Sequence, residues 1–421
     1  MKKSLRAFLV VAVALLVVGC AAPGGGGLTP NRGGATTSTG GLEYVFTPDV
    51  SYFGGPSLFG LTYGNGKYVA VGTSGTVIAS SDGTDWNLTE QRARSIAKTT
   101  YSDKGHLTRA RFIAGSRAAV GSGIAGKKLP AGRTLIDSGY SSDISGNLLG
   151  VAYGAGKFVA IGDDGFSWSS TDGTSWTQVG GVSLGWFTSI AFLNGKFVAF
   201  GYDGDYVVLT SSDGSAWSSA PMPTSDFCAG SAYGNGIYVA VVWSGSGSPI
   251  FTSTNGSNDW TAVSNGSILL PASLYQSTES GYESDIELTG VAFHDGVFVA
   301  VGTAVSHGYE SDRNVPLILV STDGINWSSQ DLPDLTPSGL GGNNIEAGLT
   351  GVAATDAGFV AVGDFYTYDG ESTTFASSIV LTSTTGRSWQ HDYYNSSLSG
   401  AVASGNGMSA IGLGDNLLDW W

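Results

Sequence analysis

Short apolar runs separated by small polar residues recur along the chain. One such segment, LTGVAFHDGVFVAVG, occupies residues 288–302 and has apolar positions on both sides of a three-residue polar break, His-Asp-Gly. Closely similar segments lie at 58–72, 148–162, 187–201, 228–242 and 349–363, and weaker ones at 107–121 and 398–412. Gly, Asn and Asp in the break accept positive φ at little cost. Each segment is therefore predicted to be a β-hairpin of two short strands.

Six of these hairpins continue into a second pattern, which VSTDGINW at residues 320–327 exemplifies. A β-rich stretch ends in Ser-x-Asp/Asn/Thr-Gly, and a Trp follows; we call this pattern the box. Its six copies contain Asp82 and Trp86, Asp172 and Trp176, Asp213 and Trp217, Asn255 and Trp260, Asp323 and Trp327, and Thr385 and Trp389. Hairpin and box together make a four-stranded unit, and repetition of such units predicts an all-β fold, a β-propeller.

The hairpin segments give eight repeat units, and seven blades remain the alternative if residues 107–121 belong to a long loop. The last unit stops without a fourth strand. Residues 42–46, LEYVF, alternate apolar and polar positions just before the first unit. We expect this N-terminal strand to pair with the C-terminal unit and close the ring. Residues 42–421 would then form a single propeller domain.

The box resembles the Asp-box (BNR) repeat of sialidase-like propellers, and the units resemble Ycf48-like propellers. This resemblance covers about residues 42–421 and implies the fold rather than an activity, because unrelated functions share the repeat. A sialidase would need an arginine triad near the start of the propeller, a Tyr–Glu pair and an acid. No Arg-Ile-Pro motif occurs, and most arginines lie between residues 92 and 133.

The box itself favours a structural role over catalysis. It occurs six times, and Asn255 and Thr385 replace the Asp without loss of the surrounding pattern. A short polar side chain can accept nearby backbone N–H groups, Gly supplies positive φ, and the Trp ring is large enough to pack between blades. We therefore predict a turn that closes each blade.

The first residues read as a targeting signal. Basic residues precede the apolar stretch 7–18, which ends in VVGC and is too short to span a membrane. This resembles a bacterial lipoprotein signal, with residues 1–19 removed and Cys20 lipidated. Ala21 follows, so the resemblance implies the outer membrane of the cell envelope if the organism is Gram-negative. Residues 20–41 are rich in Gly, Ser, Thr and Pro and are expected to form a flexible tether.

Charge and composition restrict the function. The formal charge of −15 becomes −18 without residues 1–19, which excludes nucleic acid as a natural partner. The four histidines never occur at zinc-ligand spacing. Cys228 is the second cysteine of the chain; it takes the place of a Leu in its repeat and is expected to be a buried small apolar residue.

Long segments are predicted on one side of the ring. The first-to-second and third-to-fourth strand turns should share one side, which we call the box face. The second-to-third turns and the links between units should share the other, which we call the loop face. Loop-face segments place tyrosines beside carboxylates, a combination suited to sugars or, through oxygen atoms, to calcium; a solvated acidic loop is the plain alternative. These candidate binding residues are Tyr282, Glu283, Asp285, Tyr309, Glu310, Asp312, Tyr366, Tyr368, Asp369 and Glu371.

Two functions follow from these patterns. The first is a lipid-anchored, non-catalytic binding or scaffold module that presents the loop face to a protein or glycan partner. The alternative is a sialidase-like glycoside hydrolase or lyase that uses two loop carboxylates. No catalytic residue is assigned, no cofactor is expected apart from an open question over calcium, and the chain is expected to be a monomer that meets the membrane through its lipid alone.

Overall fold

The computed structural model describes residues 44–46, 57–83, 86–88, 144, 146–179, 185–243, 248–270, 276–278, 281–283, 286–306, 313–332, 345–368, 373–394, 398–405 and 408–413. The predicted signal segment 1–19 with Cys20, the expected tether 20–41 and the segment 107–121 lie outside these residues. In the described part of the chain, no helix is both long and apolar enough to cross a membrane.

The first three described sheets are antiparallel meanders of four consecutive strands. The first comprises β2 (Leu58–Gly64), β3 (Lys67–Gly72), β4 (Thr76–Ser80) and β5 (Asn87–Leu88), with the 3-10 turn η2 (Thr73–Gly75) between β3 and β4. The second comprises β6 (Leu148–Gly154), β7 (Lys157–Gly162), β8 (Ser167–Ser170) and β9 (Thr177–Val179). The third comprises β10 (Trp186–Leu193), β11 (Lys196–Tyr202), β12 (Tyr206–Ser211) and β13 (Ser218–Pro221).

The next two meanders are joined to each other by one residue pair, Trp243 and Glu287. They comprise β14 (Phe227–Gly234), β15 (Ile237–Trp243), β16 (Ile250–Ser253) and β17 (Thr261–Ala262), then β21 (Ile286–His294), β22 (Val297–Ser306), β23 (Arg313–Ser321) and β24 (Trp327–Ser329). The link between them contains η3 (Asn265–Ser267), β18 (Ile268–Leu269), β19 (Gln276–Thr278) and β20 (Gly281–Glu283). Strand β18 pairs in parallel with β24, and β19 pairs with β20.

The last two sheets differ in size. One comprises β25 (Ile345–Thr355), β26 (Gly358–Tyr368), β27 (Thr373–Ser383) and β28 (Gln390–Tyr394). The other comprises β29 (Leu398–Gly405) and β30 (Met408–Leu413), and β1 (Tyr44–Phe46) pairs with β30 in parallel, with Tyr44 opposite Ser409. The N-terminal strand therefore belongs to the same sheet as the C-terminal hairpin.

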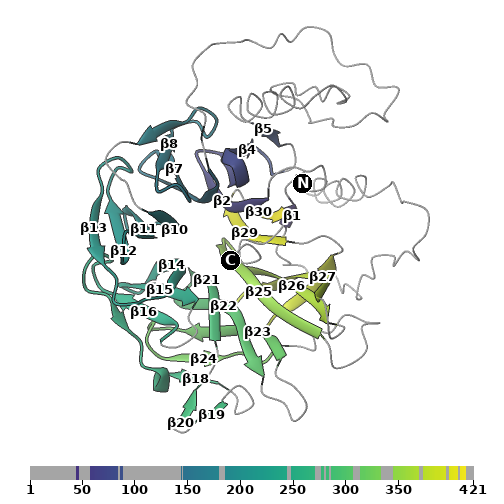
Figure 1. The fold of residues 1–421 in the computed structure, drawn as a ribbon. Coiled ribbons are helices and arrows are strands. Elements are labelled where there is room, and N and C mark those ends of the chain that lie inside the picture. The colour runs from purple at the N-terminus through teal and green to yellow at the C-terminus, as the bar shows by residue number, and fades with distance from the viewer. Residues whose placement is uncertain are drawn as a thin grey trace, which may run out of the picture.

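The sheets are arranged around a common centre (Figure 1), with the first strand of each meander innermost. Successive inner strands contact one another in chain order from β2 to β29, and β29 contacts β2. The core lies between the sheets, because each side of a sheet carries alternate apolar residues of its strands. One core cluster joins Val69 and Val71 of β3 to Phe158, Ala160 and Trp176 of the following sheet.

Glycines permit the inner strands to approach closely. A Cβ atom added to Gly60 of β2 would lie 2.8 Å from the Cα of Gly150 in β6, and one added to Gly351 of β25 would lie 1.9 Å from the carbonyl oxygen of Gly400 in β29. At these positions, which follow a register shift in the inner strand, backbone packs directly on backbone.

Candidate binding face

The box face is closed by hydrogen bonds within each box. In the second sheet, Ser170 Oγ accepts the Gly173 N–H at 2.8 Å, and Asp172 Oδ1 accepts the N–H groups of Thr174 and Ser175 at 2.8 Å. Gly173 has φ of 74°, a conformation that costs glycine little. Burial would raise the pKa of Asp172, but these hydrogen bonds lower it well below its ordinary value. The box is thus a compact turn whose polar groups bond to one another.

The fourth box forms a similar hydrogen-bonded turn, but its carboxylate comes from a different position. Its polar position is Asn255, and the carboxylate comes instead from Asp259 just before Trp260. Asp259 Oδ1 accepts the Ser253 hydroxyl, and Asp259 Oδ2 accepts the Thr254 N–H at 3.0 Å, while Asn255 Oδ1 accepts the Ser257 N–H at 2.7 Å. Sequence reasoning missed Asp259, because this box is one residue longer than the others.

The boxes also bind neighbouring sheets together. Lys67, which begins β3 directly after the first turn of the β2–β5 sheet, donates from Nζ to the carbonyl oxygen of Asp172 at 2.9 Å. Asn65 donates to the carbonyl oxygen of Thr171 at 3.3 Å, and Asn235 makes the corresponding bond to that of Thr322, at 2.8 Å, from the β14–β17 sheet to the next. The first turn of one sheet and the box of the next therefore lie together on the box face, and their polar groups are occupied in holding the sheets.

The ten predicted binding residues are expected on the loop face, and the structure describes four of them. Tyr282 and Glu283 lie on β20, and Tyr368 ends β26; for these three only the backbone is described. Tyr366 lies on β26, is partly buried and meets Phe375 of β27 edge to face at 6.0 Å. The others, Asp285, Tyr309, Glu310, Asp312, Asp369 and Glu371, lie outside the described residues. The expectation that these ten residues form one binding site therefore stays a prediction.

A group of aromatic residues that the sequence did not single out lies on the same face. Trp186 begins β10, Tyr202 ends β11, and Tyr206 begins β12 beyond the turn of residues 203–205. The rings of Trp186 and Tyr202 are stacked, with centroids 4.6 Å apart and planes 14° apart, and Tyr206 meets Tyr202 edge to face at 5.3 Å. All three side chains are partly exposed. We call this group the aromatic platform.

Carboxylates border the aromatic platform. Asp203 and Asp205 are exposed in the turn between Tyr202 and Tyr206, and Asp226 lies just before β14 in the next sheet. Burial raises the pKa of Tyr206, and the charge of Asp226 and the neighbouring Tyr202 raise it further, so Asp226 acts on the Tyr206 hydroxyl. The platform and its acids therefore lie where the third and fourth sheets meet.

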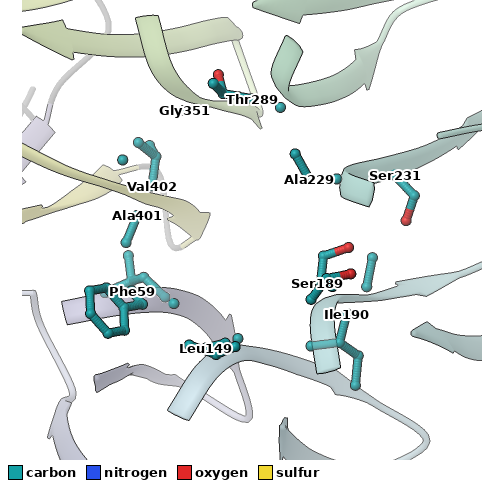
Figure 2. Close-up of a pocket in the computed structure, with 18 of the residues that line it drawn as sticks. Phe59, Leu149, Ser189, Ile190, Ala229, Ser231, Thr289, Gly351, Ala401 and Val402 are labelled. Carbon is teal, nitrogen blue, oxygen red and sulfur yellow. The ribbon is translucent and has the colours of Figure 1, made fainter. Parts of the chain in front are cut away.

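The centre of the ring holds a cavity of about 230 Å³. Residues of all the inner strands line it, including Phe59, Leu149, Ser189, Thr289 and Val402 (Figure 2), and none of its lining residues is charged. Thr289 Oγ1 donates to the Leu349 carbonyl oxygen at 2.8 Å and Ser189 Oγ to the Cys228 carbonyl oxygen at 3.1 Å. These hydroxyls join neighbouring sheets, so residues that line the cavity also hold the inner strands together.

Metal ligands do not gather in the described part of the chain: no three His, Cys, Asp or Glu residues there are grouped as a metal ion would require. His294 lies at the end of β21 and meets Phe359 edge to face at 5.8 Å. Cys228 is buried, and burial raises the pKa of its thiol to about 12. Neither residue forms part of the aromatic platform.

Comparison with known protein families supports the β-propeller fold. A model of the DUF6242 β-propeller domain matches residues 145–350. Together with the radial meanders, this match defines an all-β protein of the β-propeller class, which confirms the predicted fold class. A comparison with curated proteins gives no match.

Several solved structures are similar at low sequence identity. Ycf48 bound to a D1 peptide is 15% identical over 83% of this chain and 83% of its own, with a TM-score of 0.43. Ycf48 from Cyanidioschyzon merolae is 13% identical over 84% of this chain and 89% of its own, with a TM-score of 0.41. A GH74 enzyme from Niastella koreensis is 12% identical over 83% of this chain and 49% of its own, with a TM-score of 0.44.

Proposed function

We propose that this chain is a binding module of the bacterial cell envelope, lipid-anchored through Cys20, which presents its loop face to a partner outside the cytoplasm. The observation that carries the proposal is the difference between the two faces. On the box face, turns of two residues and compact boxes bond to one another across the sheets. On the loop face, strands extend beyond the ring and partly exposed aromatic and acidic side chains gather.

The hairpins that extend furthest on the loop face belong to two consecutive sheets. The hairpin of β22 and β23 continues to the pair Ser306 and Arg313, and that of β26 and β27 continues to the pair Tyr368 and Thr373. Strands β3 and β4 of the first sheet, by contrast, end their pairing at Gly72 and Thr76. Loops and raised hairpins on a rigid scaffold are where binding residues usually lie. A protein or glycan partner is therefore expected on this side.

We also propose that the propeller has seven blades, from the β2–β5 sheet to the sheet of β1, β29 and β30, within a single domain at 42–421. The contact of β29 with β2 and the pairing of β1 with β30 support this count. The segment 107–121 would then belong to a link between the first two blades.

The binding proposal is tested by partner capture. Full-length protein is used to capture proteins and glycans from the native envelope, and Tyr282, Glu283, Tyr309 and Glu310 are changed together to Ala. Capture is expected to be lost while the thermal unfolding transition stays unchanged. A matched variant on the box face, with Asp295→Asn, Ile325→Ala and Asp356→Asn, should capture as the unchanged chain does. Undiminished capture by the loop variant, or sugar turnover that depends on a loop acid, would reject the proposal.

A further inference from the structure

We propose that the aromatic platform of Trp186, Tyr202 and Tyr206, with Asp203, Asp205 and Asp226, is a docking site for a lysine- or arginine-bearing segment of a protein partner. This inference rests on the proposed binding role of the loop face and names the chemistry of the partner. It concerns residues that lie on the third blade and at the start of the fourth, none of which is among the ten predicted binding residues.

The platform has polar groups free to bind a ligand. Within the described residues, the indole N–H of Trp186 and the hydroxyls of Tyr202 and Tyr206 have no hydrogen-bond partner. The rings are fixed by the register of the sheet, because Trp186 lies directly opposite Tyr202 on β10 and β11, and Tyr202 opposite Tyr206 on β11 and β12. The site is thus organised before any partner arrives, which lowers the entropy lost on binding.

The charge beside the platform is uncompensated. The carboxylates of Asp203, Asp205 and Asp226 form no ion pair with any described residue; Asp226 has only the Thr224 hydroxyl, at 3.4 Å. The described lysines, Lys67, Lys157 and Lys196, all follow first turns and therefore lie on the box face. The whole chain carries a formal charge of −15. A cation arriving at the platform meets aromatic ring faces and several unpaired carboxylates at once.

These groups favour a cation over a neutral sugar or an anion. A neutral ligand that covered the carboxylates would remove their water without replacing the lost charge stabilisation, which is costly. An anionic sugar would be repelled. An ammonium or guanidinium group, in contrast, satisfies carboxylates by charge-assisted hydrogen bonds and is attracted to the faces of Trp and Tyr rings.

The chain already contains one cation held in this way. Lys196 Nζ lies 5.0 Å from the centroid of the Tyr238 ring and donates to the carbonyl oxygen of Asn255. Burial lowers the pKa of this lysine below its ordinary value, and the negative charge of Asp259 partly offsets that fall. Here a ring, an acceptor oxygen and a carboxylate receive a lysine of the neighbouring blade. The aromatic platform offers the same groups with no lysine present among the described residues.

The test is a titration of full-length protein with labelled peptides, followed by fluorescence anisotropy. The probes are an Arg-Gly repeat peptide, a Lys-Gly repeat peptide and a neutral Gln-Gly repeat peptide, and a panel of neutral oligosaccharides is titrated separately. We expect the two basic peptides to bind, the neutral peptide not to bind, and the affinity of the basic peptides to fall with added salt. The double variant Asp203→Asn with Asp205→Asn should lower that affinity about tenfold or more.

Two further variants separate the site from general charge attraction. The double variant Asp295→Asn with Asp356→Asn removes the same charge from the box face and should bind within about twofold of the unchanged chain. Trp186→Ala should lose binding and Trp186→Phe should retain most of it, with folding checked by the thermal transition. Equal weakening by both Asp pairs, or binding that Trp186→Ala leaves intact, would overturn the inference.

Binding of a neutral oligosaccharide that Trp186→Ala abolishes would also overturn it, because a glycan would then be the ligand of the platform. Each of these results concerns the platform alone. The capture experiment with Tyr282, Glu283, Tyr309 and Glu310 tests the wider role of the loop face, so the two proposals fail separately.

Discussion

Gly173, in the box of the second blade, lies directly against Val69 in β3 of the first. A Cβ atom at Gly173 would lie 2.7 Å from Val69 Cγ2, and the same relationship joins Gly214 to Val159, Gly324 to Val239 and Gly386 to Val299. The glycine of the box therefore has two tasks. It adopts positive φ, and it leaves room for a valine of the preceding blade.

These two tasks can be separated by substitution. Gly173→Ala should lower the free energy of unfolding by about 2–4 kcal/mol, because it adds a steric clash to the left-handed backbone strain. Gly156→Ala is the matched control: Gly156 has φ of 79° with nothing within 4 Å of an added Cβ, so only strain of about 1–2 kcal/mol is expected. Urea denaturation measures both, and equal losses would contradict the packing role.

Loss of the hydrogen bond between Lys67 and the Asp172 carbonyl oxygen should destabilise the fold less than Gly173→Ala does, at the same junction between blades. Lys67→Met keeps most of the apolar side chain but removes the donor, so it should cost about 1–2 kcal/mol of unfolding free energy. Lys157→Met is the comparison, since Lys157 Nζ lies 3.3 Å from Ser215 Oγ in an exposed contact and should cost less. A Lys157 variant that unfolds at lower urea concentration than the Lys67 variant would refute this ranking.

The six boxes differ in the hydrogen bond of the Trp indole. Trp327 Nε1 donates to the Gly324 carbonyl oxygen at 2.9 Å, whereas the buried Nε1 of Trp260 has no hydrogen-bond partner in the described part of the chain. Trp327→Phe and Trp260→Phe remove the same atoms. The first should therefore cost about 1 kcal/mol more than the second in unfolding free energy, because only it leaves a carbonyl without its donor. Thermal or urea unfolding of the two variants measures this difference. A larger loss of unfolding free energy for Trp260→Phe than for Trp327→Phe would be inconsistent with this account.

Acid should weaken the boxes. Burial would raise the pKa of Asp323, but hydrogen bonds from the side chain and backbone of Asn326 and from the Ile325 N–H lower it to about 2. A carboxylate whose pKa is lower in the folded state stabilises the fold above its unfolded value near 3.8, and this contribution is lost as pH falls toward 2. Asp323→Asn should therefore show a smaller drop in melting temperature between pH 5 and pH 2 than the unchanged chain. An identical drop would contradict this role.

Cys228 should be unreactive until the chain unfolds. Its side chain is 2% exposed, and burial raises the thiol pKa to about 12, although contacts with Ser189 and Gly230 oppose the rise. The thiolate is the reactive form, so a maleimide should label this residue only in denaturant. Rapid labelling of Cys228 in the native protein, located by peptide mapping, would contradict the burial.

Local patterns explain why the fold class could be predicted. The turn glycines and their neighbours fix their own backbone: Asn65, Asn194, Asn235 and Asp295 all have positive φ at the positions where the hairpin pattern places the turn. The Ser, Asp and Gly of a box likewise bond within a few residues of one another. These turns and boxes are determined by residues close together in the sequence, so they can be predicted from the sequence alone.

The aromatic platform depends instead on strand register. Trp186 and Tyr202 lie 16 positions apart and occupy the first and last positions of a hairpin whose buried residues include Phe187, Phe197 and Phe200. The sequence signal was the pair of tyrosines on either side of Asp-Gly-Asp at residues 203–205, but their partner Trp186 becomes visible only once the register is known. The predicted role of the tyrosine-bearing loops stays a prediction.

Glycines of the inner strands determine how closely some neighbouring sheets approach one another. Because Gly60 meets Gly150, and Gly351 meets Gly400, through backbone atoms, the spacing between β2 and β6 and between β25 and β29 is set by the thickness of the chain itself. A side chain at Gly60 or Gly351 would push two neighbouring sheets apart. At these two junctions, residues without a side chain set the distance between neighbouring inner strands.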